Sequence, residues 1–228
     1  MSNINVLKRD GTTEELNLEK VHKMVEFAVE GLAGVSASQV EIQSGLQFCD
    51  GIKSADIQEI LIRSASDLIS EEHPNYQYVA ARLLLFGLRK AVHGHPEILP
   101  PLSEHIKGCV DKGVYDGTIV NRYSEEEWNR IDSFVDHERD YLFTYAGLRQ
   151  VVDKYLVQDR STGEHYESPQ QMYIMIAATL FANYPTETRL DYVRRYYNAI
   201  STHKNQHPHP HHGRGQDTHS SICILCSG

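Results

Sequence analysis

The feature that most restricts the fold of this chain is a series of helix-length segments, each opened by a residue that caps helices. Between Asn17 and Ile200, apolar residues mostly recur at three- and four-residue spacing, which is the period of an amphipathic helix. Asn17, Ser54 and Ser124 each stand just before such a segment, and side-chain oxygens at these positions accept from the free amides of a first helical turn. The sequence therefore predicts a mainly α-helical fold.

The N-terminal part predicts a small β-hairpin followed by a cluster of four helices. Residues 5–9 form a short extended run, Asp10-Gly11 is a strong turn signal, and residues 12–16 would form the returning strand. The expected helix starts are Asn17, Ser36 or Ser38, Ser54 and Pro74. Residues 94–101 are rich in proline and glycine, and we place a domain boundary there, between residues 95 and 96.

Residues 96–204 are also predicted to be helical, with a second hairpin that turns at residues 161–163. Two capping-box patterns mark helix starts, Ser124 with Glu127 and Ser168 with Gln171, and a proline occupies the first position of the second helix. The segment 172–182 is apolar nearly all round, so this helix should be buried on most faces. A last helix is expected over residues 187–200.

The segment from Asn205 to Gly228 has a different character. It is rich in histidine and has too little apolar surface to fold, so we expect it to be disordered. Cys223 and Cys226 form a C-x-x-C beside several histidines, which taken alone would suggest a zinc site. Codons for this segment also permit another peptide when they are read one base later, PTPIMAGVRTPTRQFASCVL. A shifted frame explains the histidines without selection for ligands, so we predict no metal site.

Composition narrows the class of protein. The formal net charge of −9 argues against a general nucleic-acid or acidic-membrane binder, because phosphate contacts need clustered lysine and arginine. No apolar run reaches membrane-spanning length, and the N-terminus lacks the apolar core of a signal peptide. The four cysteines are too scattered for a disulfide framework, so Cys49 and Cys109 are expected to be reduced. We expect a soluble, cytoplasmic protein.

Three blocks of the sequence, in order, resemble the large (alpha) subunit of class I ribonucleotide reductase. The run VLKRDG at residues 6–11, with polar residues after it, is similar to the ATP-cone, the adenine-nucleotide sensor of these enzymes, and residues 51–58 and 89–90 fit the same module. Residues 136–173 look like the helical domain that precedes the catalytic barrel. The second-frame peptide resembles the start of that barrel, which implies a frameshift near Lys204.

The resemblance implies three regions. Residues 1–95 would be the ATP-cone, an allosteric nucleotide-binding domain, and residues 96–204 the helical N-terminal domain of the large subunit. Residues 205–228 would be a frameshifted tail. Without the barrel, the apolar helix at residues 172–182 is expected to lack packing partners. The arginines of the last helix, Arg189, Arg194 and Arg195, are expected on a solvated or barrel-facing side.

The cone resemblance also implies a set of binding residues. It assigns phosphate to Lys8, Arg9, Lys20 and Lys90, nucleotide polar groups to Glu14 and Asn17, base or sugar to Ser54 and Gln58, and the adenine walls to Val21 and Ile57. Many family members carry histidine at the position of Gln58. The residues by themselves leave a second interpretation open, in which the lysine-arginine pair is ordinary turn chemistry, Asn17 an ordinary cap, and the apolar pair ordinary core.

The implied function is that of a regulatory fragment of a ribonucleoside-diphosphate reductase, a thioredoxin-linked oxidoreductase. ATP and dATP would be its effectors, and other large subunits and the radical-bearing small subunit its partners, with no nucleic acid and no membrane. The catalytic cysteines of the family lie in or beyond the barrel, so the chain alone is expected to be inactive, with no catalytic residue. The alternatives are a stand-alone ATP-binding modulator of intact reductase, a cone-containing repressor, and a metal-binding protein acting through the tail. No cysteine pair precedes the cone, which counts against the repressor.

Overall fold

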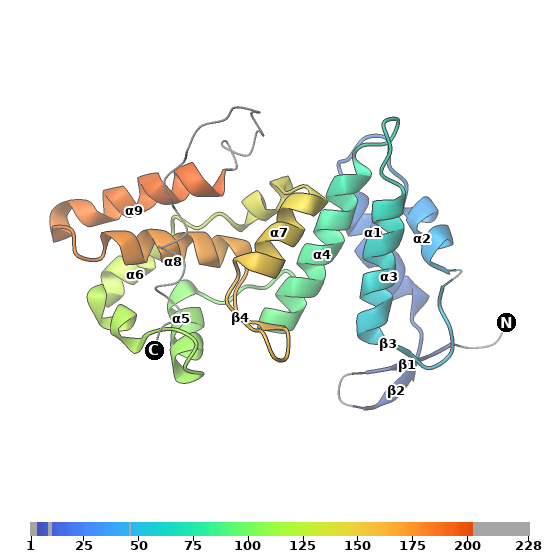
Figure 1. Ribbon diagram of the computed structural model, residues 1–228, viewed down its shortest axis with the longest axis horizontal. Coiled ribbons are helices and arrows are strands. Elements are labelled where there is room, and N and C mark those ends of the chain that lie inside the picture. The colour runs from blue at the N-terminus through green and yellow to red at the C-terminus, as the bar shows by residue number, and fades with distance from the viewer. Residues whose placement is uncertain (1–3, 9–10, 46, 203–228) are drawn as a thin grey trace. The chain divides into compact units, whose positions relative to one another are not determined.

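The computed structural model describes residues 4–8, 11–45 and 47–202, and these form two compact units (Figure 1). The first unit contains the described residues up to Gly87 together with Phe143–Gln150. The second contains Leu88–Leu142 and the described residues from Val151 onward. The tail that was predicted to be disordered lies outside the described residues, and so does its C-x-x-C. The described part of the chain is mainly helical, as predicted.

The first unit contains a three-stranded sheet that includes the predicted hairpin. β1 (Asn5–Leu7) pairs antiparallel with β2 (Thr13–Glu15) and parallel with β3 (Ile52–Lys53), in the order β2-β1-β3. β3 was not predicted, because a strand this short gives no alternating pattern. Gly51, with a φ of 78°, turns the chain into β3, and this left-handed conformation favours glycine.

Four helices complete this part of the chain, as the cap residues predicted. They are α1 (Leu18–Val29), α2 (Ala37–Gly45), α3 (Ser54–Asp67) and α4 (Tyr76–His93). Asn17 is confirmed as the cap of α1, and its side chain accepts from the Lys20 amide at 3.0 Å. The predicted cap at Ser54 is wrong by one residue: Lys53 occupies that position and Ser54 is the first helical residue. The chain enters α3 directly from β3, which leaves no loop for a separate cap.

The core of the first unit is formed by the apolar faces of the helices. Residues of this core with no measurable exposure are Val25, Val40, Leu61, Ala65, Tyr76, Val79, Ala80 and Leu83. Val21 and Ile57 belong to the same core and are 8% and 7% exposed. Their burial follows from helical spacing, and it places both side chains inside the fold without any ligand.

The second unit is built from shorter elements and two long helices. Its elements are α5 (Leu102–Asp111), η1 (Gly117–Arg122), α6 (Glu125–Asp132), η2 (His137–Leu142), the end of α7 (Tyr145–Lys154), β4 (Gln158–Asp159), β5 (Glu164–His165), α8 (Pro169–Phe181) and α9 (Thr186–Ser201). The capping box at Ser124 and Glu127 is confirmed by both of its hydrogen bonds. The second hairpin is confirmed too, with Gly163 at a φ of 75° in its turn.

α8 is buried along most of its length, as its uniformly apolar sequence predicted. The expectation that this helix lacks packing partners is wrong. α9 runs alongside it (Figure 1) and buries Leu190, Val193 and Tyr197, while η2 packs against it as well. The expected solvated or barrel-facing position is also wrong for Arg189, because its side chain pairs with Glu127 of α6 and is 12% exposed.

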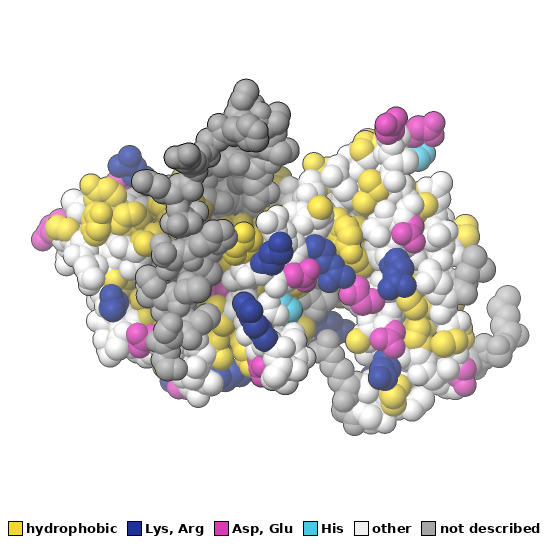
Figure 2. All heavy atoms as spheres, viewed as in Figure 1, with side chains coloured by type: hydrophobic (Ala, Val, Ile, Leu, Met, Phe, Trp, Pro, Cys, Tyr) yellow, Lys and Arg dark blue, Asp and Glu magenta, His cyan; other side chains and the backbone are white. Residues whose placement is uncertain are grey.

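The surface carries charges of both signs. Figure 2 shows lysine and arginine side chains interspersed with aspartate and glutamate over the face in view. Within the described residues, none of the helices combines the length and the apolar character needed to cross a membrane. Cys49 and Cys109 are free thiols, as predicted, and Cys109 is buried.

Candidate functional site

Lys8 and Glu14 meet at the β1–β2 hairpin. The Lys8 Nζ lies 2.6 Å from the Glu14 Oε2, and the two side chains are 41% and 42% exposed. An ion pair this exposed contributes little to stability, because water solvates both charges well. The lysine is therefore available to exchange its carboxylate partner for another anion.

The start of α3 lies beside the end of β1. In the parallel ladder Leu7 pairs with Lys53, so the next residues along the two strands are Lys8 and Ser54. Lys53 makes no side-chain hydrogen bond to the first turn of α3. The amides of that turn and the positive end of the helix dipole are thus close to two lysines, an arrangement that favours an anion.

The start of α1 lies near the other end of β1. The Leu16 amide donates to the Ile4 carbonyl at 2.8 Å, and the Asn17 cap and the exposed Lys20 follow directly. The structure therefore pairs the side chains of Lys8 and Glu14, and it joins the Asn17 side chain to the backbone amide of Lys20. It places the two pairs toward opposite ends of the same strand.

Gln58 packs against α4. Its amide nitrogen donates to the Leu83 carbonyl at 2.6 Å. At Gly87 an added Cβ would stand 3.0 Å from the Gln58 Cγ, so the absence of a side chain at Gly87 lets this part of Gln58 approach the helix. Lys90 lies further along α4, on the exposed surface of the second unit. Arg9 lies outside the described residues.

A cavity of about 780 Å³ opens in the first unit between α1, α2 and the strand β2. Of the predicted site residues only Val21 lines it. The other lining residues are Ile4, Glu15, Leu16, Leu18, Glu19, His22, Glu41, Ser44, Gly45 and Phe48. Three carboxylates in the lining oppose a phosphate group. Sequence reasoning missed this cavity, because it arises from the packing of α1 on α2 and has no local pattern.

His22 is the titratable group on the rim of this cavity with two acidic partners. Its Nδ1 lies 2.6 Å from a Glu41 oxygen and its Nε2 lies 3.1 Å from a Glu26 oxygen. The hydrogen bond with Glu41 is the main reason that the pKa of His22 is raised. The ring thus shields part of the negative charge of the cavity at mildly acidic pH.

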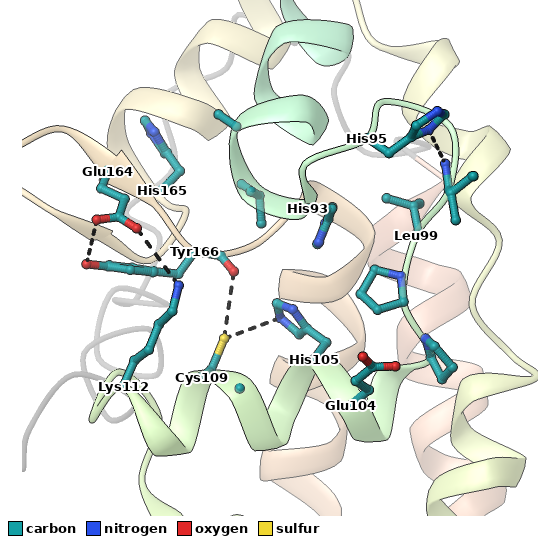
Figure 3. A pocket seen from close by; sticks show the side chains of 16 residues that line it. His93, His95, Leu99, Glu104, His105, Cys109, Lys112, Glu164, His165 and Tyr166 are labelled. Carbon is teal, nitrogen blue, oxygen red and sulfur yellow. Dashed lines mark hydrogen bonds and ion pairs between the residues drawn. The ribbon is translucent and has the colours of Figure 1, made fainter. Parts of the chain in front are cut away.

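A second cavity, of about 570 Å³, lies in the second unit (Figure 3). His93 comes from α4, His105 and Cys109 come from α5, and Tyr166 follows β5. The Cys109 Sγ lies 3.7 Å from the His105 Nε2 and 3.7 Å from the Tyr166 carbonyl. Sequence reasoning did not single out this cluster.

Burial keeps three side chains of this second cavity, His93, His105 and Cys109, uncharged near neutral pH. It lowers the pKa of His93 to about 4 and that of His105 to about 3, and it raises the pKa of Cys109 to about 11. A neutral thiol is a poor nucleophile, because the thiolate is the reactive form. Within the described part of the chain, no group of three or more His, Cys, Asp or Glu side chains could hold a metal ion.

Comparison with known proteins identifies both parts of the chain. A family model described as "ATP cone domain" matches residues 4–91, and one described as "Ribonucleotide reductase, all-alpha domain" matches residues 141–211. The first range holds all ten residues predicted to bind a nucleotide. The second includes α8 and α9.

The curated relatives that the chain resembles are alpha subunits of ribonucleoside-diphosphate reductase. The chain is 52% identical over 208 residues to ribonucleoside-diphosphate reductase 1 subunit alpha of Escherichia coli K12, covering 91% of this chain and 27% of that protein. It is 41% identical over 214 residues to the subunit alpha of Enterobacteria phage T4, covering 92% and 28%. The subunit alpha of Helicobacter pylori is 34% identical over 181 residues, covering 79% and 22%.

The chain thus spans little more than a quarter of the length of the first two relatives, 27% and 28%. The two matched domains follow one another in the order that the sequence blocks predicted. With its ATP cone and its all-alpha domain, the chain belongs to the ribonucleotide reductase large-subunit family.

Proposed function

We propose that this chain binds ATP or dATP as an allosteric effector of a ribonucleoside-diphosphate reductase and that the chain alone performs no reduction. The proposal rests on one observation above the others, which is the match of an ATP cone over residues 4–91. We keep the predicted division as part of the proposal, with the cone at 1–95, the helical domain at 96–204 and a frameshifted tail at 205–228.

The proposed binding residues are those implied by the cone resemblance. The proposed phosphate contacts are Lys8, Arg9, Lys20 and Lys90. The proposed polar contacts are Glu14, Asn17, Ser54 and Gln58, and the proposed apolar contacts are Val21 and Ile57. The exposure of the Lys8–Glu14 pair and the uncapped start of α3 support this assignment, since both favour an incoming anion.

The two effectors differ by one ribose hydroxyl, so any discrimination must come from a few polar contacts. Ser54 and Gln58 are the proposed sources of these contacts, as the residues assigned to base or sugar. In the assembled reductase we propose the radical-bearing small subunit and further large subunits as partners.

Calorimetric titration of ATP and dATP into the chain tests the proposal. Replacing Lys8 or Lys20 with alanine should weaken binding about ten- to hundred-fold, because a charge-assisted phosphate contact contributes about 1.5–3 kcal/mol. Lys23→Ala is the matched control, since Lys23 is an exposed lysine of α1 that pairs with Glu19 at 2.9 Å. Binding that is absent in the parent chain, or unaffected by both cone substitutions, would contradict the proposal.

A further inference from the structure

A buried polar network in the second unit begins at α4. Arg89 is 3% exposed, and its Nη2 lies 2.9 Å from the Asp140 Oδ2 of η2. The same nitrogen donates to the His137 carbonyl at 2.8 Å, and Nη1 lies 3.3 Å from the Tyr141 hydroxyl. The guanidinium group is thereby attached to three residues of η2, through one backbone carbonyl and two side chains.

The network continues from η2 into α8 and α9. The other Asp140 oxygen accepts from the Gln170 Nε2 at 2.9 Å, and the Gln170 Oε1 accepts from the Tyr197 hydroxyl at 2.7 Å. Gln170 and Tyr197 have no measurable exposure. Side-chain bonds therefore run without interruption from α4 through η2 and α8 to α9.

A buried network of this kind adds little to the stability of the fold, but it fixes the positions of its side chains. Burial raises the pKa of Asp140, with the charge of Arg89 opposing that rise, so desolvation offsets much of the attraction between the two groups. Each bond nevertheless depends on direction and distance, and a buried partner left without its bond costs free energy. A shift of Arg89 must therefore be accommodated by Asp140 and by Gln170 behind it.

The neighbouring residue on α4 is Lys90, one of the proposed phosphate contacts. Successive residues on a helix point about 100° apart, and here Arg89 is buried while Lys90 is exposed. A force on Lys90 that turns or shifts the last turns of α4 also moves the guanidinium group of Arg89. Within the described residues the Arg89 Nε has no hydrogen-bond partner. This N–H group can therefore donate a hydrogen bond if the guanidinium group takes a second position.

We propose that Arg89 is a positioning residue that couples the effector held by Lys90 to the α8–α9 pair. The coupling rests on the proposed function, because it needs a nucleotide phosphate at Lys90. Occupation of the cone would shift the final turns of α4, and the Arg89–Asp140–Gln170–Tyr197 network would pass that shift to the two helices of the all-alpha domain. By reciprocity, a change in α8 and α9 would alter effector affinity.

Amide hydrogen exchange on the whole chain, with and without saturating ATP, tests the coupling. We expect ATP to slow exchange in α8 and α9 by about five-fold or more, which is the lower end of ordinary allosteric coupling. In Arg89→Lys the charge is kept but the forked contact is lost, so ATP should still bind while α8 and α9 no longer respond. Asp140→Asn provides a second variant at the next position of the network.

Arg82→Lys is the matched control. Arg82 is another arginine of α4, and it donates to the Glu30 carbonyl at 2.7 Å in the first unit. This variant should keep the response of α8 and α9. Calorimetric heat on ATP addition with unchanged exchange in both helices of the parent chain would overturn the coupling alone. Absence of that heat would overturn the proposed function and the coupling together, and a response that persists in Arg89→Lys and Asp140→Asn would overturn the role of the network.

Discussion

Individual buried side chains set the charge state around the second cavity. Burial lowers the pKa of His93 and His137 to about 4 and that of His105 to about 3, while it raises the pKa of Glu167 to about 7. Glu167 accepts from the Val157 amide at 2.9 Å and from the Tyr115 hydroxyl, which keeps it bonded in spite of its burial. The two kinds of group affect stability with opposite signs.

The histidines and Glu167 give distinct pH dependences of unfolding. A histidine whose pKa is about 3 in the folded state and 6.5 otherwise binds a proton first in the unfolded chain, so its contribution to stability is complete above pH 6.5 and falls as the pH is lowered. Glu167 titrates near 7 instead of 4.5, so its contribution is complete below pH 4.5 and is lost as the pH rises through 7.

Urea unfolding at pH 5 and pH 7 separates these contributions. The parent chain should be less stable at pH 5, because three histidines outweigh one carboxyl group. His105→Gln should reduce the difference by about 2 kcal/mol, and Glu167→Gln should enlarge it. Equal pH dependence in the parent chain and both variants would show that these groups are not the cause.

At the scale of elements, the start of α6 is stabilised from two directions. The Ser124 Oγ accepts from the Glu127 amide at 3.2 Å, and a Glu127 oxygen accepts from the Ser124 amide at 2.8 Å. The same carboxylate pairs with Arg189 of α9, whose Nε lies 2.7 Å from the Glu127 Oε1. The hydrogen bond with Arg189 is the main reason that the pKa of Glu127 is lowered. One side chain thus caps α6 and fixes it to α9.

Substitutions at the start of α6 should differ in how much they lower the free energy of unfolding. Ser124→Ala should lower the free energy of unfolding by about 1 kcal/mol, the ordinary effect of losing a helix cap. Glu127→Gln should cost about 2 kcal/mol, because it also leaves Arg189 without its anion. Ser103→Ala, at an exposed position of α5, is the control and should change little. Denaturant unfolding measures all three, and a larger effect for Ser124→Ala than for Glu127→Gln would contradict this account.

At the scale of the whole molecule, the chain pairs a nucleotide-sensor domain with an all-alpha domain. The described residues contribute two cysteines, of which Cys109 is buried with a pKa near 11. Cys49 and Cys109 are both free thiols. A reduction that depends on a thiyl radical and a redox dithiol, as the family resemblance implies, has no support among these residues.

We therefore predict that the chain gives no ribonucleotide turnover when it is mixed with a reductase small subunit and thioredoxin. A complete large subunit from a relative serves as the positive control in the same assay. The blank is the same mixture without the small subunit, and a turnover rate above that blank would contradict the prediction.

The elements that the sequence predicted are those with local signals. The helices α1 and α6 begin where Asn17 and Ser124 predicted, because a cap acts on amides two or three residues away. The hairpin turns at 11 and 163 follow from glycine in a left-handed conformation. The strand β3 was missed, because it exists only through its pairing with Val6 and Leu7.

The candidate site also combines features that have local sequence signals with features that arise only from tertiary packing. The cone residues were assigned from an ordered sequence pattern, and Lys8, Glu14, Asn17 and Lys20 form local pairs that the hairpin and the cap explain. Neither cavity was predicted, because the walls of each come from segments distant in sequence. The contact of Gln58 with α4 also depends on a close approach at Gly87, which has no local signature.

The sequence by itself determined the helical character, the two hairpins, most helix starts and the family, since each is recorded in short-range spacing or in ordered motifs. Only the tertiary structure decided what covers α8, where Arg189 finds its partner, and how Arg89 is joined to Tyr197. These features depend on which side chains meet across the fold. Burial then decides their protonation and their hydrogen bonds, because a polar group removed from water must find its partner within the protein.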